Sequence, residues 1–165
     1  MNVTLKPISQ NDREPVIDIL NHYIQHSFAA YPEQKHPYEF FDAFMHICEW
    51  YPAVTARNEQ DELVGFGLLR PYSPSPSLTF SGTAEITYFI KPDYTGHGIG
   101  RKFLDHLVTQ GRQLGLTTIL AQISSLNEGS IRFHLHNGFS ECGRFRNVGK
   151  KRGQTFDVVF CQLML

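Results

Sequence analysis

The chain has few of the features that mark secreted, metal-binding or membrane proteins. Its 165 residues include three cysteines, an odd number for a disulfide framework, and no CxxC pair that would indicate zinc binding or redox chemistry. No apolar run approaches the roughly 18 residues of a membrane span, and the first residues lack the apolar core of a secretion signal. These absences favour a reducing compartment, which we expect to be the cytoplasm.

Neither sign of charge is in excess. The chain has 15 Lys and Arg residues against 16 Asp and Glu residues, for a formal net charge of −1. Without a basic excess, we expect it to bind neither nucleic acid nor an anionic membrane. The hydrophobic fraction of 41% and the aromatic fraction of 13% predict a substantial core, and the length predicts a single domain, residues 1–165.

Hydrophobic periodicity predicts a mixed α/β fold. Strands are expected at Val3–Ile8, Ala53–Arg57, Glu62–Arg70, Phe80–Lys91, Leu116–Ile123, Ser140–Val148 and Thr155–Met164. Helices are expected after Ser9, with Val16, Ile17, Leu20 and Ile24 inward, at Pro37–Glu49, with Phe40, Phe41 and Phe44 inward, at Gly98–Leu114 and at Glu128–Asn137. The continuously apolar run Leu116–Ile123 predicts a strand buried on both faces. Pro71–Ser77 predicts an exposed loop between two strands.

The strongest local signal is the glycine-rich turn Gly96–Arg101, which precedes an amphipathic helix. Its glycines allow positive φ and close approach to a ligand, and its N–H groups, with the helix N-terminus, suit a phosphate or pyrophosphate. A P-loop would need Lys and then Ser or Thr, and a dinucleotide fingerprint would need glycine at position 101. The GxGxG turn of a coenzyme A site and a connector without a ligand are the remaining interpretations.

Around this turn the chain resembles the GNAT superfamily of N-acetyltransferases, and within it the phosphinothricin and methionine-sulfone N-acetyltransferase group. The matching residues are Glu85–Pro92, Gly96–Gly100, Ala121–Ile123, Asn127, Ser130, His134, Gly138–Phe139, Gly149, Lys151, Gly153 and Asp157–Val158. The resemblance implies a central, twisted, mostly antiparallel sheet of six to seven strands, splayed between its fourth and fifth strands and flanked by about four helices. It also implies acetyl-CoA as the acetyl donor.

The resemblance further implies where acetyl-CoA is held. Its pyrophosphate is expected on the turn, at Gly96, His97, Gly98, Ile99, Gly100 and Arg101. Its pantetheine is expected along the backbone of Phe89 and Ile90, with an amide bonded to Asn127. Thr95 stands where the superfamily usually has Gln or Arg, so we expect Arg101 to replace a phosphate contact. Thr155 stands where the phosphinothricin group has Trp.

Two side chains are candidates for the chemistry of acetyl transfer. An aliphatic amine with a pKa near 10 must lose a proton before it attacks, and Glu85, among apolar neighbours, is the candidate base. Backbone N–H groups near Phe89 or Ile90 are candidates to stabilise the oxyanion. His134 stands where many superfamily members have Tyr, and is the candidate proton donor to the departing thiolate. A solvated strand-end acid and a packing histidine are the respective structural alternatives.

The acceptor side depends on weaker signals. Arg70, at a strand end, is the candidate partner for a substrate carboxylate, and the candidate pocket walls are Phe28, Tyr31 and Tyr72. We expect direct acetyl transfer to the amine of a free amino acid or analogue. The alternatives are an acyl-CoA-binding regulatory module without turnover and a protein N-terminal or lysine acetyltransferase. The bulky segment Ala29–Pro37 is more typical of a lid than of an open groove.

Two pairs of histidines and a basic hairpin are further candidates for binding. His22 with His26 and His134 with His136 have metal-ligand spacing, but no acidic or Cys partner is near in sequence, so no metal is expected. The last hairpin is rich in basic residues, namely Arg144, Arg146, Lys150, Lys151 and Arg152. We expect them in a solvated turn or a subunit contact. Binding of a phosphate or an acidic substrate is the alternative. The resemblance to the family implies a homodimer, and this hairpin favours the same expectation.

Overall fold

A computed structural model describes residues 2–73 and 78–165 of the chain. Within these ranges, seven strands form one mixed sheet in the order β1-β2-β3-β4-β5-β7-β6. The strands are β1 (Thr4–Pro7), β2 (Ala53–Arg57), β3 (Leu63–Pro71), β4 (Thr83–Ile90), β5 (Thr118–Ser124), β6 (Ser140–Lys151) and β7 (Gln154–Met164). The helices are α1 (Arg13–His26), α2 (Phe41–Cys48), α3 (Ile99–Gln113) and α4 (Glu128–His136). The predicted mixed α/β class is confirmed.

A short 3₁₀ turn, Gln10–Asp12, leads into α1, and contacts between Ser9 and Asp12 fix its start. The backbone N–H of Ser9 donates to Asp12 Oδ2 at 2.7 Å, and the Ser9 hydroxyl contacts the same oxygen at 3.0 Å. This contact satisfies donors that a helix start leaves unpaired. The predicted inward residues of α1 are all buried: Val16, Ile17, Leu20 and Ile24.

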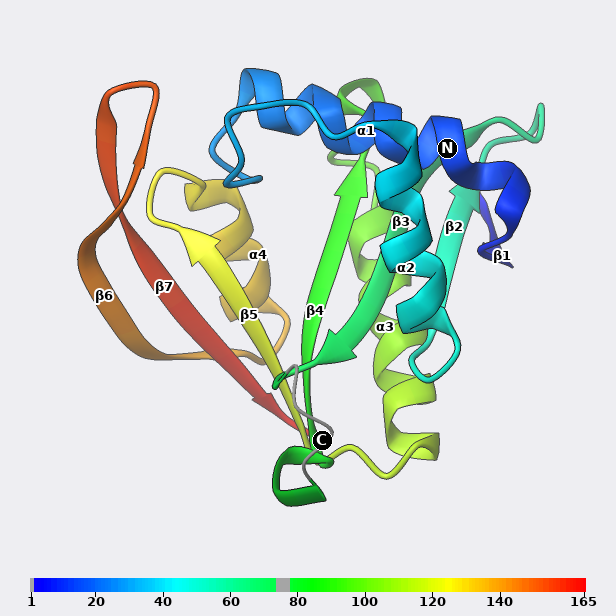
Figure 1. Cartoon of the computed structure of the whole chain (residues 1–165). Helices are drawn as coiled ribbons and strands as arrows, with labels where there is room; N and C mark the ends of the chain where they lie inside the picture. Colours follow the sequence, from blue (N-terminus) through cyan, green and yellow to red (C-terminus); the bar gives the residue numbers. More distant parts are fainter. Residues whose placement is uncertain (1, 74–77) are drawn as a thin grey trace.

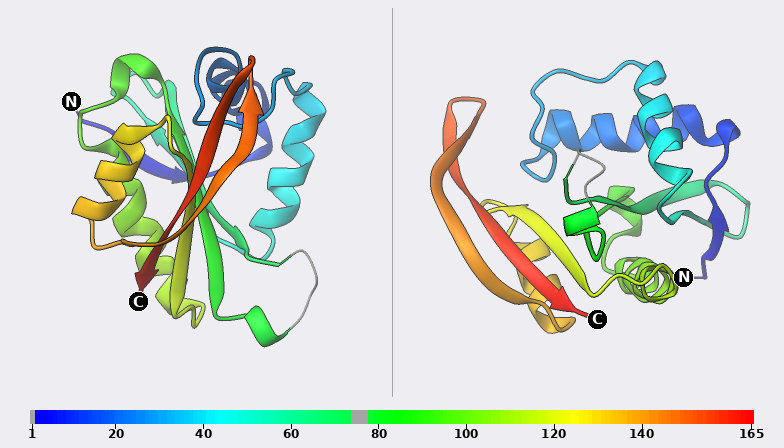
Figure 2. Two further views of the ribbon diagram at one scale, coloured as in Figure 1. Left: turned by 90° about the vertical axis from the view of Figure 1, so that its left-hand side faces the viewer. Right: turned by 60° about the horizontal axis from the view of Figure 1, so that its bottom comes forward.

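Two helical layers cover the two faces of the sheet. Figure 2 shows α1 and α2 on one side of the strands, and α3 and α4 on the other. Phe41 of α2 and Phe66 of β3 belong to the first core, and Phe103 of α3 belongs to the second. Each of these rings is fully buried, worth roughly 2–3 kcal/mol of transfer free energy.

Strand β4 divides the two cores. Successive side chains of a strand point to opposite faces. Ile86, Tyr88 and Ile90 pack with the core under α3, while Phe89 packs with the core under α1 and α2. Glu85 lies an even number of residues before Phe89, so its side chain is on the same face of the sheet, toward α1 and α2.

The sheet splays between β4 and β5, as predicted. These parallel strands pair only over Thr83–Glu85 and Thr118–Leu120, and beyond that point Figure 1 shows them diverging as a V. Strand β5 instead pairs with β7 along its whole length. One edge of β4 is therefore left without a neighbouring strand from residue 86 onward.

Three sequence predictions were wrong in detail. Strand β5 is not buried on both faces, because Gln122 is exposed where the strands diverge. Phe40 is 37% exposed and stacks on His36 at 3.8 Å between ring centroids, instead of facing the core. Phe80 lies in a short 3₁₀ helix (Leu78–Phe80), so β4 begins later than expected.

The predicted loop after β3 is only partly observed. Pro71 is the last residue of β3, and residues 74–77 lie outside the described ranges. Of the helices that the structure describes, none combines the length and apolar character needed to cross a membrane.

Candidate active site

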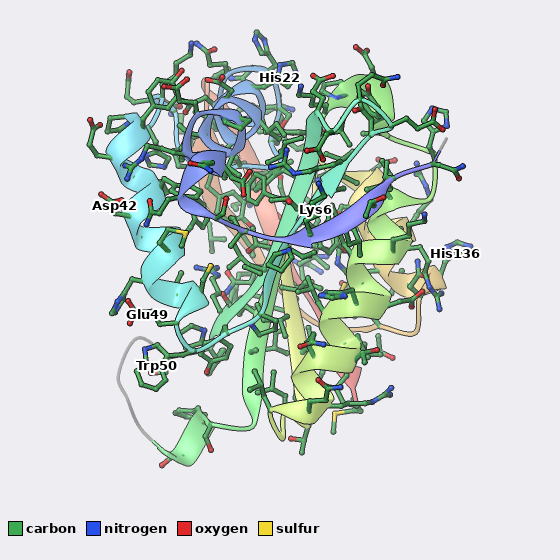
Figure 3. All side chains as sticks on the ribbon, turned by 90° about the vertical axis from the view of Figure 1, so that its right-hand side faces the viewer. Lys6, His22, Asp42, Glu49, Trp50 and His136 are labelled. Carbon is green, nitrogen blue, oxygen red and sulfur yellow. The ribbon has the colours of Figure 1, made fainter. Side chains whose placement is uncertain are left out.

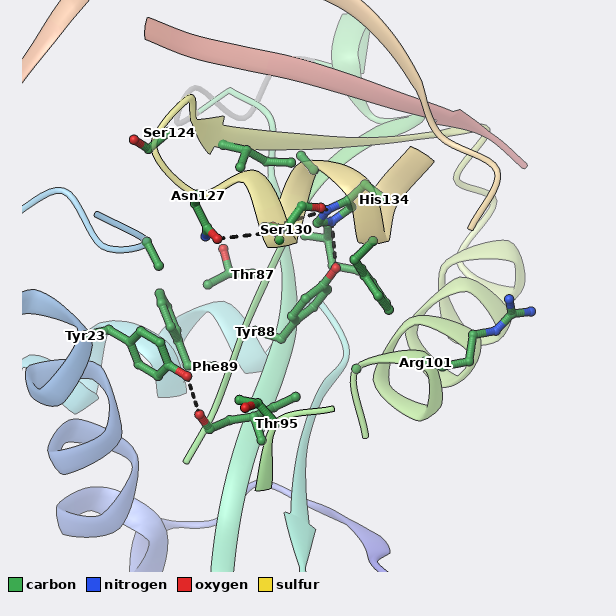
Figure 4. A pocket seen from close by; sticks show the side chains of 18 of the residues that line it. Tyr23, Thr87, Tyr88, Phe89, Thr95, Arg101, Ser124, Asn127, Ser130 and His134 are labelled. Carbon is green, nitrogen blue, oxygen red and sulfur yellow. Dashed lines mark hydrogen bonds between the residues drawn. The ribbon is translucent and has the colours of Figure 1, made fainter. Parts of the chain in front are cut away.

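The splay opens into a cleft of about 660 Å³. Its lining comes from β4, from the turn before α3, from β5, from the start of α4 and from the end of α1 (Figure 4). Because it is lined by Thr87 and Phe89 as well as Ile86 and Tyr88, the cleft passes from one face of the sheet to the other. Such a passage suits an elongated ligand.

The glycine turn lies at one end of this cleft. Gly96 has φ of 77° and Gly98 has φ of 79°, a region that favours glycine. A Cβ built on either residue would have no atom within 4 Å, so the turn is open. Helix α3 starts at Ile99, directly after the turn. The local geometry is that of an anion site at a helix start.

Most of the residues predicted to bind the donor line the cleft. These are Phe89, Ile90, Gly96, Gly98, Gly100, Arg101 and Asn127. His97 is exposed on the turn and is not among the lining residues. The side chain of Ile99 is buried in the core, at 1% exposure, so only its main chain belongs to the turn.

Arg101 does not direct its guanidinium at the turn. Its Nε donates to both carboxylate oxygens of Asp105, at 2.8 and 2.9 Å, and its Nη1 donates to Asn137 Oδ1 at 2.6 Å. In Figure 4 its side chain points away from the other labelled residues. The guanidinium thus links α3 to the end of α4, and its replacement of a phosphate contact stays a prediction.

The free edge of β4 carries unpaired backbone groups. Lys91 N–H donates to Val64 O at 2.8 Å, and in an antiparallel ladder hydrogen-bonded and non-bonded pairs alternate. In the observed register, Phe89 therefore bonds with Phe66, while the N–H groups of Tyr88 and Ile90 point toward β5. The carbonyl of Ile90 accepts from the Tyr23 hydroxyl at 2.5 Å.

His134 of α4 lines the cleft, and each of its ring nitrogens lies within hydrogen-bond distance of an oxygen atom. Its Nδ1 is 2.7 Å from the Ser130 carbonyl oxygen, and its Nε2 is 2.6 Å from the Tyr88 hydroxyl. The side chain is 3% exposed, and burial lowers its pKa from 6.5. Burial likewise raises the pKa of Tyr88. Asn127 caps the same helix by accepting from Ser130 N–H at 3.3 Å.

Glu85 lies at the apex of the splay, outside the cleft lining. It is 5% exposed, and its Oε2 is 2.5 Å from Arg70 Nη2. Gln122 Nε2, which lines the cleft, donates to its Oε1. Arg70 and Glu85 stand directly opposite each other on β3 and β4, a pairing that the sequence analysis did not foresee. The side chain of Arg70 is still 47% exposed.

The predicted aromatic wall is organised by a residue that sequence reasoning missed. Phe156 of β7 lies 5.7 Å from the Tyr31 ring, stacked, and 6.0 Å from Phe28, edge-on. Burial raises the pKa of Tyr31 to about 12, with a contribution from the charge of Glu85. Arg70 acts on Tyr31 in the opposite direction, so this ring of the wall lies within range of both charges of the Arg70–Glu85 pair. Tyr72 lies apart, against Phe80 at 5.4 Å.

Lys151 corrects the prediction of a solvated basic hairpin. Its side chain is fully buried, and Nζ donates to the carbonyl oxygens of Ser27 and Ala30, at 2.8 and 2.6 Å. Burial lowers its pKa. This lysine anchors the segment that carries Phe28 and Tyr31 to the end of the long hairpin.

The histidine motifs show no metal site. In the part of the chain that the structure describes, no group of three or more His, Cys, Asp or Glu side chains is placed to hold a metal ion. Figure 3 shows His22 and His136 on separate parts of the surface. The rings of His22 and His26 lie 4.8 Å apart.

An open glycine turn at a helix start, and a free strand edge along a cleft between two splayed strands, are the features expected of a coenzyme A-dependent acyltransferase. The chain matches the acetyltransferase (GNAT) family over residues 17–139, and it belongs to that family. It is therefore an acetyltransferase with acetyl-CoA as donor, as the sequence predicted.

Several proteins that resemble this chain over nearly its whole length are named as acetyltransferases or acyltransferases of amino acids or their analogues. The L-methionine sulfoximine/L-methionine sulfone acetyltransferase of Pseudomonas paraeruginosa is 28% identical over 100% of this chain and 96% of its own length. An L-amino acid N-acyltransferase of Escherichia coli is 28% identical over 93% of this chain and 89% of its own. The phosphinothricin acetyltransferase of Sinorhizobium meliloti, solved with acetyl-CoA, has a TM-score of 0.94 at 26% identity, over 100% of this chain and 89% of that one.

Proposed function

We propose that the protein transfers the acetyl group of acetyl-CoA directly to the amine of a free amino acid or a close analogue. The observation that carries the proposal is the Arg70–Glu85 pair at the apex of the splay, whose charges act on Tyr31 of the aromatic wall that Phe28, Tyr31 and Phe156 form. Cation, carboxylate and aromatic rings are the groups that recognise a carboxylate, an ammonium and a side chain. The names of the relatives support the same substrate class.

The cleft fits the donor along its length. The open turn at Gly96 and Gly98 offers main-chain N–H groups to the pyrophosphate. The free N–H groups of Tyr88 and Ile90 can pair with the pantetheine amides or stabilise the oxyanion on the thioester carbonyl. Phe89 N–H, an earlier candidate for that role, is used in the ladder with β3.

Arg70 and Glu85 are proposed to work together on the acceptor. A guanidinium has five N–H donors, so Arg70 can keep its bond to Glu85 and still present its exposed half to a substrate carboxylate. Glu85 then receives the ammonium proton, through water because its own side chain is buried. The neutral amine attacks the thioester, without an acyl-enzyme. His134 is proposed to act on the thiolate side of the cleft.

A matched panel of acceptors tests the substrate class. Release of free CoA thiol from acetyl-CoA is followed with L-amino acids, with methionine sulfone, methionine sulfoximine and phosphinothricin, with the corresponding decarboxylated amines, and with peptides. We expect free amino acids or their analogues to react, and each decarboxylated partner to lose at least tenfold in kcat/KM, because it lacks the group that Arg70 pairs with.

The two alternatives give different results in the same panel. Faster acetylation of peptides would indicate a protein acetyltransferase. Binding of acetyl-CoA without turnover on any acceptor would indicate a regulatory module. The segment 27–37 favours a small acceptor, since Lys151 fixes its first part and Asn21 pairs with the backbone of His36 at its far end.

We also propose a homodimer. Strand β6 is an edge strand of the described sheet, and it exposes Phe145 and Val148 by 58% and 59%. Light scattering on the purified chain distinguishes a dimer from a monomer. The cytoplasmic location stays a prediction.

A further inference from the structure

Tyr88 lines the cleft, and the chemistry described so far gives its hydroxyl no role. The side chain leaves β4 on the face of α3 and α4, lines the cleft, and lies parallel to the His134 ring at 5.7 Å between centroids, with an interplanar angle of 14°. In Figure 4 its hydroxyl points at His134. The oxygen lies 2.6 Å from Nε2.

The direction of this hydrogen bond follows from the other side of the ring. The Ser130 carbonyl oxygen, 2.7 Å from Nδ1, can only accept. The Ser130 hydroxyl oxygen also lies near Nδ1, at 3.3 Å, and can accept from the same N–H. Because the closer carbonyl requires a donor, Nδ1 carries the ring proton and Nε2 presents a lone pair. Tyr88 must donate to it, so the neutral His134 has no proton at Nε2 to give.

Burial maintains this arrangement. It lowers the pKa of His134 and raises the pKa of Tyr88, which disfavours both the imidazolium and the tyrosinate. Cys161, whose charge would act on Tyr88, is itself buried with a raised pKa. Of the two members of the pair, Tyr88 is the one with an O–H to offer to a ligand in the cleft.

We propose that the Tyr88 hydroxyl, held in place by His134, donates the hydrogen bond that stabilises the departing CoA thiolate. As the tetrahedral intermediate collapses, the C–S bond breaks and sulfur takes its electron pair. The O–H of Tyr88 rotates from Nε2 toward that sulfur and keeps its proton. The amine proton leaves through Glu85 and water, and the thiolate is protonated from solvent. His134 is thus a positioning residue, and this inference rests on the proposed function.

Binding of CoA and desulfo-CoA tests the proposal without an acceptor. Both are titrated by calorimetry into wild type and Tyr88→Phe at about pH 9.5, where a thiol with a pKa of about 8.5 is mostly ionised. We expect the variant to bind CoA roughly tenfold or more weakly, as expected for loss of a hydrogen bond to a charged group. Desulfo-CoA, which has no thiolate, is expected to bind both proteins equally.

Tyr23→Phe is the matched control. It also removes a hydroxyl from the cleft lining, but that hydroxyl donates to the Ile90 carbonyl, so the ratio of the two dissociation constants should stay as in wild type. An equal loss for CoA and desulfo-CoA in Tyr88→Phe, or no loss for either, would overturn the role of Tyr88. If neither ligand binds wild type, the proposed function fails as well.

A second variant tests the role of His134. Gln at position 134 can accept from Tyr88 but does not titrate, so His134→Gln should keep kcat within about tenfold of wild type, while Tyr88→Phe should lose more. It should also leave the pH dependence of kcat unchanged below neutral pH. A loss in His134→Gln that exceeds that in Tyr88→Phe would show that the histidine itself supplies the proton.

Discussion

Arg70 and Glu85 connect the fold to the chemistry at the scale of single residues. They are direct neighbours across β3 and β4, on the face of the sheet under α1 and α2. Removing the charge of Glu85 leaves Arg70 without its partner and, in the proposed mechanism, leaves the acceptor without a base. In Glu85→Gln we expect kcat to fall by about a hundredfold or more, with the dissociation constant of acetyl-CoA changed by less than about threefold.

Asp12 provides a control for that substitution. Its carboxylate is also buried and paired with an arginine, Arg57, away from the cleft. Asp12→Asn should therefore lower the free energy of unfolding while kcat is retained. Comparable turnover in Glu85→Gln and wild type would remove Glu85 from the mechanism.

His134 makes the stability of the fold depend on pH. Because burial holds its folded pKa below the ordinary 6.5, the unfolded chain takes up a proton before the folded chain does as the pH falls below about 6.5. The free energy of unfolding then decreases. In His134→Gln this part of the decrease should be absent, as measured by denaturant unfolding across about pH 7 to pH 5.

His136 serves as its control on the same helix. This histidine is exposed, and its Nδ1 lies 2.7 Å from the Arg132 carbonyl oxygen. His136→Gln should follow the wild-type decrease. A parallel decrease in His134→Gln would contradict the assignment of a neutral, buried ring.

At the scale of elements, the turn before α3 is the proposed site for the pyrophosphate of acetyl-CoA. Gly98 has φ of 79° and open space around it, so Gly98→Ala adds strain of about 1–2 kcal/mol without a clash. The strain shifts the N–H groups of the turn, and we expect acetyl-CoA to bind about tenfold more weakly in a calorimetric titration.

A substitution at Gly115 is the control that distinguishes the effect of backbone strain from an effect on acetyl-CoA binding. It has φ of 80° after the other end of α3, again with open space. Gly115→Ala should lose similar stability and bind acetyl-CoA as wild type does. Equal affinities in Gly98→Ala and wild type would refute the turn as the pyrophosphate site.

The hairpin of β6 and β7 supplies Phe156 to the proposed acceptor wall. A Cβ on Gly149 would lie 2.3 Å from the Phe156 ring, so Gly149→Ala must displace that ring from Phe28 and Tyr31. We expect KM for the acceptor to rise severalfold, with acetyl-CoA affinity unchanged. Gly143→Ala on the same strand meets no atom within 4 Å and should leave both constants as they are. An equal KM for the acceptor in the two variants would contradict the assignment of Phe156 to the acceptor site.

At the scale of the whole molecule, local signals explain what the sequence predicted well. The glycine turn, the cap of α1 and the short pairing of β4 with β5 each depend on nearby residues or on the resemblance to a family. Phe156 and Lys151 were missed because their contacts cross the chain; Lys151 meets Ser27, which is 124 residues away in sequence. The pairing of Arg70 with Glu85 was not predicted because it depends on strand register, which hydrophobic alternation alone does not give.

The role of Tyr88 shows the same limit. Its position on β4 was predictable, but its contact with His134 joins a strand to a helix 46 residues later. Only the folded chain brings the hydroxyl to the imidazole, and only the Ser130 carbonyl decides which of them holds the proton.

A crystal structure of the protein with acetyl-CoA tests the central claim most directly. The account predicts that the ligand enters the V between β4 and β5, with its diphosphate on the main-chain N–H groups of Gly96–Gly100 and its sulfur beside the Tyr88 hydroxyl. Acetyl-CoA bound elsewhere on the surface, or with its sulfur remote from both Tyr88 and the Arg70–Glu85 pair, would contradict it.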